Sequence, residues 1–258
     1  MKLTGNTIFI TGGGSGIGRG LAEAFHKRGN RVIIAGRRKG HLAETIKANP
    51  GMQSIELNVG EPASIAAVAR KLIAEYPKLN VLINNAGIMR IDDVAGVVDE
   101  ELLAPTITTN LLGPIRMTSA LMEHLKKQDS ATVIHVSSAL GFVPLAMTAV
   151  YCSTKAALHS YSLSQRYRLK GSSVKVLELA PPWVQTDLLG SNNNKDPRAM
   201  PLAEFIDETM KVLGTDTDEI LVERAQAFRN NVGPNEAALI TAFNDQMAQP
   251  QVTPVAGD

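Results

Sequence analysis

The sequence predicts a single-domain α/β protein in which helices cover both faces of a parallel sheet. Six short apolar runs, near residues 7, 31, 53, 80, 132 and 174, alternate with helix-length amphipathic segments along the 258 residues. This alternation is typical of doubly wound sheets, for which we expect the strand order 3-2-1-4-5-6. Hydrophobic residues make up 44% of the chain and no linker divides it, so one core can form.

A glycine-rich turn follows the first predicted strand. The apolar run at residues 7–10 leads into a turn of spacing G-x-x-x-G-x-G, and apolar residues at helical spacing come next. Gly12, Gly16 and Gly18 let the backbone approach a pyrophosphate, which the free N–H groups at a helix start can bind. The segment therefore predicts a dinucleotide-binding turn, with Ser15 and Ile17 as further contacts. A turn without a ligand is the alternative.

Tyr151 and Lys155 form a candidate proton-transfer pair. Apolar spacing predicts a helix over residues 151–169, and residues four apart lie on one face of a helix. A positive charge beside a phenol lowers its pKa from the ordinary value of about 10 toward neutral pH. Tyr151 could then act as a general acid and base, although a two-residue pattern can also occur by chance.

Five motifs occur in the order and approximate spacing of one enzyme family. They are the glycine turn preceded by Thr11, the segment Asn84-Asn85-Ala86-Gly87, Asn110, Ser138, and the Tyr151/Lys155 pair. From residue 5 to about residue 190 the chain resembles the short-chain dehydrogenases/reductases of the Tyr-x-x-x-Lys type. The resemblance implies a Rossmann fold and an oxidoreductase that acts on CH–OH groups with NAD(P).

The resemblance implies a catalytic role for four side chains. Tyr151 would exchange a proton with the substrate oxygen, and Ser138 would hydrogen-bond the same oxygen. Lys155 would lower the pKa of Tyr151 and hold the nicotinamide ribose, and Asn110 would hold a water that links Lys155 to solvent. Hydride would come from the cofactor. The alternatives are a buried structural amide at Asn110 and a strand-end hydroxyl at Ser138.

The resemblance also implies which loops contact the cofactor. The candidate contacts are Gly12, Ser15, Gly16, Ile17, Gly18, Arg37, Arg38, Asn58, Val59, Asn84, Ala86, Gly87, Tyr151, Lys155, Pro181, Val184 and Thr186. Two positions depart from the family pattern. Asn58 stands where an aspartate usually contacts the adenine, and Pro182 replaces a glycine, which stiffens the loop.

Residues 36–39 favour NADP(H) as the cofactor. A carboxylate at the end of the second strand would bind the ribose diol of NAD, whereas arginine binds a 2′-phosphate. Gly36 stands at the position expected for the acid, and Arg37, then Arg38, is the preferred phosphate contact. Binding of NAD(H) and a merely solvated basic turn are the alternatives.

The predicted substrate side is mostly apolar. Its residues are Met89, Ile91, Leu140, Phe142, Val143, Leu145, Trp183, Leu188 and Leu189. We therefore expect the enzyme to interconvert an apolar or amphipathic ketone or aldehyde and the alcohol. The alternative is a non-catalytic NADP(H)-binding sensor or structural subunit.

Composition and charge argue against several other classes of protein. The net charge is +1 and there is no basic stripe, so we expect no nucleic-acid or membrane partner. Without a signal segment or a long apolar stretch, the expected location is cytoplasmic. Cys152 is the only cysteine, which excludes an intrachain disulfide. The histidines show no metal-ligand spacing, so we expect no metal site.

After residue 190 the sequence predicts helices without a further strand. Helix-like stretches lie near 201–213, 216–230 and 234–247, so we expect a seventh strand to be absent. The domain would span residues 1–249, with a loose tail at 250–258. Residues 187–213 are a candidate lid.

The expected assembly follows from the missing strand. In many family members the seventh strand builds one face of a tetramer. Because we expect this strand to be absent, we expect a homodimer through the helices near 100–126 and 153–169, with a tetramer as the alternative.

Overall fold

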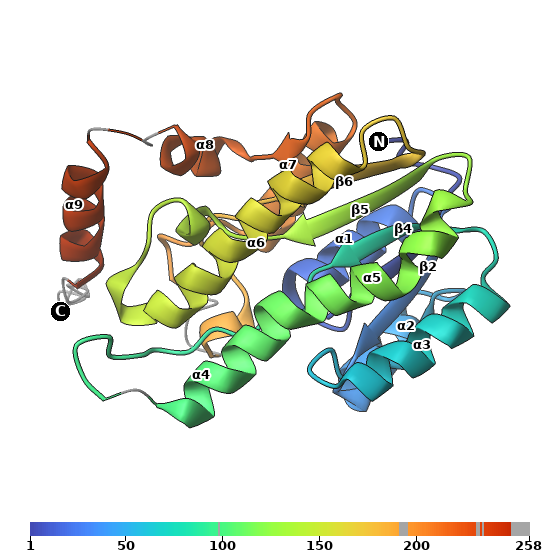
Figure 1. Cartoon of the computed structure of the whole chain (residues 1–258), viewed down its shortest axis with the longest axis horizontal. Helices are drawn as coiled ribbons and strands as arrows, with labels where there is room; N and C mark the ends of the chain where they lie inside the picture. The colour runs from blue at the N-terminus through green and yellow to red at the C-terminus, as the bar shows by residue number, and fades with distance from the viewer. Residues whose placement is uncertain (98, 191–195, 231–232, 234, 249–258) are drawn as a thin grey trace, which may run out of the picture.

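The computed structural model of the chain is a seven-stranded parallel sheet between two layers of helices (Figure 1). It describes residues 1–97, 99–190, 196–230, 233 and 235–248, so the predicted tail at 250–258 lies outside the described residues. The six expected strands are present: β1 (Thr7–Thr11), β2 (Arg31–Gly36), β3 (Gln53–Glu56), β4 (Leu79–Asn84), β5 (Ala131–Val136) and β6 (Val174–Leu179).

A seventh strand is also present, so the prediction of its absence is wrong. The sheet order is β3-β2-β1-β4-β5-β6-β7, and β7 (Glu219–Ile220) pairs in parallel with β6. The segment 216–230, which had a helix-like pattern, contains β7 and the short helix α8 (Glu223–Arg229). Two residues are too few to show the alternation that marks a strand. Backbone hydrogen bonds to β6 form β7, and the local sequence does not reveal them.

The central strands are buried on both faces. Successive side chains of a strand point to opposite sides of the sheet, and in β1 Ile8 and Ile10 enter one core while Phe9 enters the other. Strands covered on both sides are continuous apolar runs rather than alternating ones. This explains why the strand positions were readable from the sequence.

Two sets of helices cover the faces of the sheet. One core includes side chains of α1 (Gly16–His26), α2 (Lys39–Ala48) and α7 (Leu202–Leu213), and the other includes side chains of α3 (Pro62–Glu75) and α5 (Gly113–Lys126). In Figure 1, α6 (Ala149–Arg168) runs beside α5 in front of the sheet. The remaining α-helices are α4 (Glu100–Ile107) and α9 (Glu236–Ala248).

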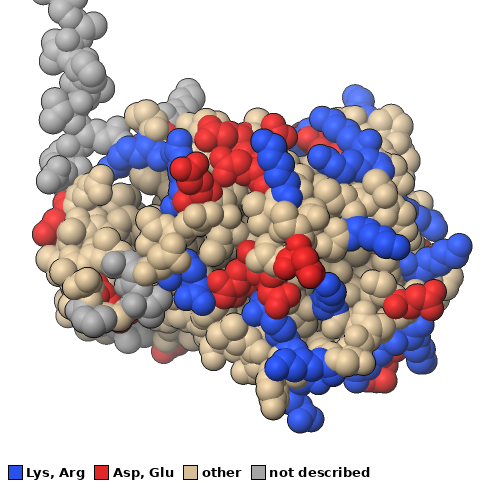
Figure 2. Space-filling model, turned by 90° about the horizontal axis from the view of Figure 1, so that it is seen from above, with Lys and Arg blue, Asp and Glu red and all other residues tan. Residues whose placement is uncertain are grey.

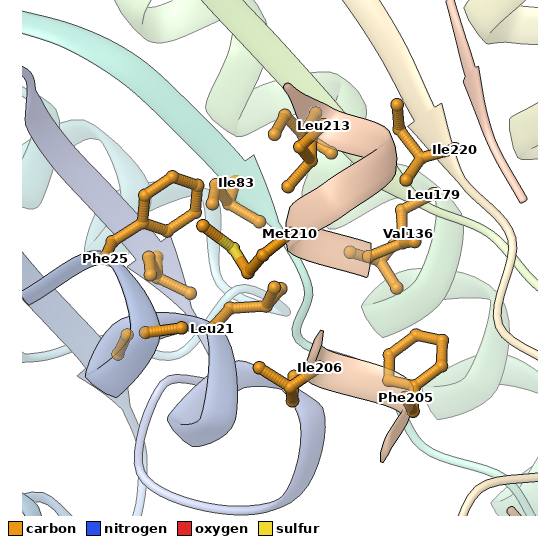
Figure 3. Close-up of a cluster of buried hydrophobic side chains, with 14 of the residues drawn as sticks. Leu21, Phe25, Ile83, Val136, Leu179, Phe205, Ile206, Met210, Leu213 and Ile220 are labelled. Carbon is orange, nitrogen blue, oxygen red and sulfur yellow. The ribbon is translucent and has the colours of Figure 1, made fainter. Parts of the chain in front are cut away.

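Helix α7 is part of the core. Phe205, Ile206 and Met210 pack between α1 and the strands, where they meet Leu21 and Phe25 (Figure 3). The candidate lid at 187–213 therefore ends in a helix whose apolar face is buried. Residues 191–195 of that region lie outside the described residues, and closure of the region stays a prediction.

The surface carries both signs of charge. Figure 2 shows basic and acidic side chains interspersed over one face of the molecule. Among the described residues, no helix combines the length and the apolar character needed to cross a bilayer.

Candidate active site

The glycine turn is held against the end of β4. Gly12 has a φ of +68°, and a Cβ there would lie 2.9 Å from the Cα of Ala86. The Nδ2 of Asn85 donates to the carbonyl oxygens of Thr11 and Gly12 at 3.0 and 3.2 Å. The hydroxyl of Thr11 accepts from the backbone N–H groups of Asn85 and Ala86. These hydrogen bonds fasten the turn to the loop that follows β4.

The start of α1 fits a pyrophosphate. Ser15 is the N-cap residue but makes no side-chain hydrogen bond to the first turn, so the positive end of the helix is not capped by it. A Cβ on Gly18 would lie 2.3 Å from the carbonyl oxygen of Gly12. The absence of a side chain at Gly18 therefore lets the helix lie close to the turn. Gly16, with a φ of +50°, faces Thr186, whose Cγ2 would be 3.4 Å from an added Cβ.

The predicted adenosine contacts lie on two sides of the end of β2. Arg37 and Asn58 line one pocket of about 490 Å³, whose other lining residues are Glu56, Leu57, Glu61 and Ser64. Arg38 instead points to the glycine turn and donates from Nη2 to the hydroxyl of Ser15 at 2.7 Å. The structure thus places one arginine at the pocket and the other at the turn.

Tyr151 and Ser138 meet in the buried part of the site. Each residue is only 6% exposed, and Ser138 is close enough to act on the pKa of the Tyr151 phenol. Ser138 follows β5 and also accepts from the N–H of Leu140 at 3.1 Å, which fixes its rotamer. Burial raises the pKa of the Tyr151 phenol, and Ser138 opposes this only in part.

Lys155 lies beside Tyr151 but is directed at the sheet. Its Nζ donates to the carbonyl oxygen of Val136 at 2.8 Å and is 5.5 Å from the centroid of the Tyr151 ring. Burial lowers the pKa of Lys155 to about 8, and the negative charge of Glu178 acts in the opposite direction. Burial is the largest influence on the Tyr151 pKa, and a lowering of that pKa by Lys155 stays a prediction.

Asn110 lies in a π-helical turn, Thr108–Leu112, between α4 and α5. It is fully buried, and its amide exchanges two hydrogen bonds with the backbone of Ile88, at 2.9 and 2.8 Å. A Cβ on Gly87 would lie 3.4 Å from the Oδ1 of Asn110 and 3.7 Å from the Nζ of Lys155. The fold thus brings Asn110, Gly87 and Lys155 together, and the amide also satisfies backbone groups.

Three other residues predicted to contact the cofactor are wholly or partly buried. The side chain of Asn84 is buried and donates to Thr118 at 2.8 Å, so its neighbour Asn85 is the residue that reaches the glycine turn. Val59 is buried against Gly113. Ile17 is partly buried against the core.

The loop after β6 lies beside the loop after β5. The carbonyl oxygen of Pro181 accepts from the N–H of Ala139 at 2.9 Å. Val184 forms an isolated parallel bridge with Met200.

Helix α9 contributes residues to the site that the sequence analysis missed. Leu145, Tyr151 and Cys152 form a buried apolar cluster, and the side chains packed on it are Met89, Leu140, Phe243 and Met247. Asn244 fastens α9 to the loop before Tyr151, since it donates to the carbonyl oxygen of Pro144 at 3.1 Å and accepts from the N–H of Ala146 at 2.5 Å. Phe243 follows no motif, and only the helical pattern near 234–247 marked this segment.

Comparisons with known proteins identify the family of the chain. A family model for short chain dehydrogenases matches residues 6–197. The uncharacterized oxidoreductase DltE of Bacillus subtilis (strain 168) is 37% identical over 250 residues, which cover 95% of this chain and 99% of that protein. The 3-oxoacyl-(acyl-carrier-protein) reductase FabG of Escherichia coli (strain K12) is 32% identical over 205 residues, or 79% and 83% of the two chains.

A solved structure is similar over nearly the whole chain. The short chain dehydrogenase from Burkholderia cenocepacia J2315, crystallised with NADP, has a TM-score of 0.80 and 26% identity, and the match covers 97% of this chain and 100% of that one. The chain belongs to the short chain dehydrogenase family. It is an oxidoreductase of this family, whose members typically act on CH–OH groups with NAD(P).

We predict that Gly12→Ala destabilises the protein and Gly40→Ala does not. At Gly12 the positive φ and the contact with Ala86 should cost about 1–3 kcal/mol of unfolding free energy. Gly40 lies in α2 with open space around it, so alanine should be neutral or stabilise by up to about 1 kcal/mol. Urea denaturation measures both, and equal stabilities would contradict the close packing of the turn.

Proposed function

We propose that the chain is an NADP(H)-dependent oxidoreductase that interconverts an apolar or amphipathic ketone or aldehyde and the corresponding alcohol. The observation that carries the proposal is the burial of Tyr151 and Ser138 beside Lys155, whose Nζ lies 5.5 Å from the centroid of the Tyr151 ring. The family and the closely packed glycine turn support a nicotinamide cofactor on the same edge of the sheet.

Tyr151 is the proposed proton donor for reduction. Because burial raises its pKa, the phenol stays protonated at neutral pH and has a proton to give to the substrate oxygen. Ser138 is proposed to hydrogen-bond the same oxygen as negative charge develops on it. Bound NADPH supplies the hydride that reaches the carbonyl carbon.

Lys155 supplies positive charge on the phenol side of the site. Below a pH of about 8 its side chain is an ammonium, which stabilises the phenolate that remains after Tyr151 gives up its proton. Asn110 lies close to Lys155 and is proposed to hold the water through which that proton is replaced.

Arg37 supports NADP(H) rather than NAD(H). It lines the pocket at the end of β2, where a guanidinium can bind a 2′-phosphate with two hydrogen bonds. Glu56 lies in the same pocket but is paired with Lys39 at 3.0 Å, which reduces its repulsion of a phosphate. The NADP bound to the Burkholderia cenocepacia structure is consistent with this choice.

An apolar substrate is supported by the side chains around Tyr151. Met89, Leu140, Phe243 and Met247 pack there, and the neighbouring loop exposes Ile91, which is 64% accessible. Such a wall favours hydrocarbon over charged groups. A non-catalytic NADP(H)-binding sensor is the alternative, and a homodimer through α4, α5 and α6 and a cytoplasmic location stay predictions.

We predict that Tyr151→Phe abolishes turnover and leaves NADPH binding intact. The substitution removes the proton donor with little change in shape, so kcat should fall by about a hundredfold or more. Steady-state NADPH oxidation with a panel of apolar ketones and aldehydes measures the loss. Tyr167→Phe is the matched control, because Tyr167 lies on the same helix and is 68% exposed. Unchanged turnover of Tyr151→Phe would refute the proton-transfer role.

We predict that Arg37→Ala weakens NADPH binding about tenfold and changes NADH binding little. The lost contact is a charge-assisted hydrogen bond to the 2′-phosphate, which NADH lacks. Fluorescence titration with both cofactors gives the two Kd values. Arg38→Ala tests the second candidate, and the exposed Arg70→Ala is the control. Equal losses for NADPH and NADH would argue against phosphate recognition by Arg37.

We predict that Phe243→Ala alters substrate choice without altering cofactor affinity. The smaller side chain leaves more space for the substrate beside Tyr151. The ratio of kcat/KM for long over short straight-chain 2-ketones should therefore change severalfold. Gln246→Ala, on an exposed position of the same helix, should leave the ratio unchanged. An identical ratio for Phe243→Ala and wild type would place the substrate elsewhere.

A further inference from the structure

A carboxylate on the loop after β4 contacts the start of α6, the helix that carries Tyr151. The Oδ1 of Asp92 accepts from the N–H of Ala149 at 3.1 Å, and its Oδ2 accepts from the N–H of Val150 at 2.9 Å. The N–H of Asp92 itself donates to the carbonyl oxygen of Met147 at 2.9 Å. These hydrogen bonds join the loop to the chain just ahead of Tyr151, although Asp92 and Ala149 are 57 residues apart in the sequence.

Asp92 takes the place of a capping side chain at the start of α6. The first N–H groups of a helix have no partner within it, and a nearby side-chain oxygen often accepts from them. Thr148 is the N-cap residue, but its side chain makes no such bond, and its hydroxyl donates to the carbonyl oxygen of Leu145 instead. The negative charge of Asp92 also suits the positive end of the helix.

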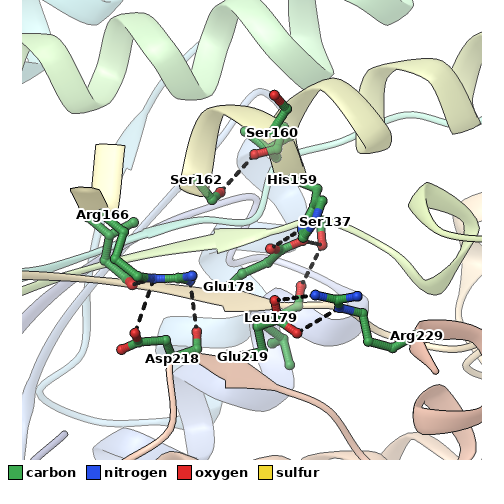
Figure 4. Close-up of polar contacts among 12 residues, drawn as sticks. Ser137, His159, Ser160, Ser162, Arg166, Glu178, Leu179, Asp218, Glu219 and Arg229 are labelled. Atoms are coloured by element: carbon green, nitrogen blue, oxygen red, sulfur yellow. Dashed lines mark hydrogen bonds and ion pairs between the residues drawn. The ribbon is translucent and has the colours of Figure 1, made fainter. Parts of the chain in front are cut away.

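Further along α6, side chains fasten the helix to the sheet. The Nδ1 of His159 lies 2.7 Å from the Oε2 of Glu178, a buried residue of β6 (Figure 4). The Nε of Arg166 lies 3.4 Å from the Oδ2 of Asp218, just before β7. Both attachments come more than two turns after Tyr151, so neither one holds the first turn of the helix. The loop after β4 supplies the attachment at that end.

The same loop contacts two other parts of the site. The backbone of Ile88 is hydrogen-bonded to the amide of Asn110, and Met89 packs against the cluster that contains Tyr151. Asp92 follows three residues after Met89. The loop thus lies against the side chain of Tyr151 through one residue and against the backbone ahead of it through another.

We propose that Asp92 is a positioning residue of this enzyme: by capping α6 from the loop after β4, it holds the phenol of Tyr151 at the place where the substrate oxygen binds. The consequence for turnover rests on the proposed function, whereas the position of the Tyr151 ring in the folded protein does not.

The expected effect on Tyr151 follows from its place in the helix. It is the third residue of α6, so its ring moves with the first turn. Without the carboxylate of Asp92, two N–H groups of that turn lose their acceptor, and the turn is free to fray. Proton transfer needs the phenol within hydrogen-bond reach of the substrate oxygen, so a small displacement slows it.

Asp99 offers a matched control, because it caps α4 in the same way. Its Oδ1 accepts from the N–H groups of Glu101 and Leu102 at 2.9 and 3.3 Å. Asp92→Ala and Asp99→Ala each remove a carboxylate that accepts two hydrogen bonds from the start of a helix, so both should lower the Tm by similar amounts. Asp99, however, does not cap the helix that carries Tyr151.

Fluorine NMR of the whole chain labelled with 3-fluorotyrosine tests the position of Tyr151 without any need for activity. The chain has four tyrosines, and Tyr151→Phe identifies the signal of Tyr151. We expect Asp92→Ala to move or broaden this signal and to leave the signals of Tyr161 and Tyr167, further along α6, in place. Asp99→Ala should leave the Tyr151 signal unchanged.

Either of two results would overturn the proposal. An unchanged Tyr151 signal in folded Asp92→Ala protein would show that the cap does not hold the ring. Equal changes in Asp92→Ala and Asp99→Ala would show a general loosening of the protein. If Asp92→Ala does not fold, Asp92→Asn decides alone. Its side-chain oxygen accepts only one of the two N–H groups, so the Tyr151 signal should still move, and an unchanged signal would then count against the proposal.

Kinetics extends the comparison to turnover. We expect Asp92→Ala to lower kcat about tenfold with an unchanged Kd for NADPH, and Asp92→Asn to lower kcat less, because one hydrogen bond is kept. Asp99→Ala should keep the wild-type kcat, and equal kcat values for the two alanine variants would contradict the positioning role. If wild-type protein turned over no carbonyl substrate, the proposed function would fail, while the fluorine signals would still decide the role of Asp92.

Discussion

The parallel pairing of β1, β4, β5 and β6 is the constraint on which the site depends. Because these strands run in the same direction, their carboxyl ends meet at one edge of the sheet, and the loops that follow them become neighbours. Thr11 and Asn85 join the first two loops, and the hydrogen bond from Ala139 to Pro181 joins the last two. Residues that are far apart in the chain are thereby held together.

Burial sets the chemical character of the site. Tyr151 and Lys155 are both enclosed, and enclosure favours the neutral form of each, so the phenol keeps its proton and the lysine pKa falls to about 8. A neutral phenol suits proton donation to a carbonyl oxygen. Helix α9 adds to the enclosure through its contacts with the loop before Tyr151.

The sequence was sufficient for the six strands and for the family. Continuous apolar runs mark strands buried on both faces, and the glycine turn and the Tyr151/Lys155 pair are local patterns of a few residues. β7 was missed because it has only two residues and forms by pairing with β6. The sequence does not tell which of two adjacent amides points to the turn: Asn85 contacts it, Asn84 is directed at Thr118, and the predicted contact of Asn84 with the cofactor stays a prediction.

By itself, the sequence determined the α/β class, the family resemblance and the residue types available for proton transfer, because these depend on local periodicity and on spacing. Tertiary structure decided the pKa values of Tyr151 and Lys155, the contacts of Glu178 and the packing of Phe243 near the site. Desolvation and long-range contacts arise only when distant segments pack together. A lone glutamate in the run Val174–Leu179 was visible in the sequence, but its partners were not.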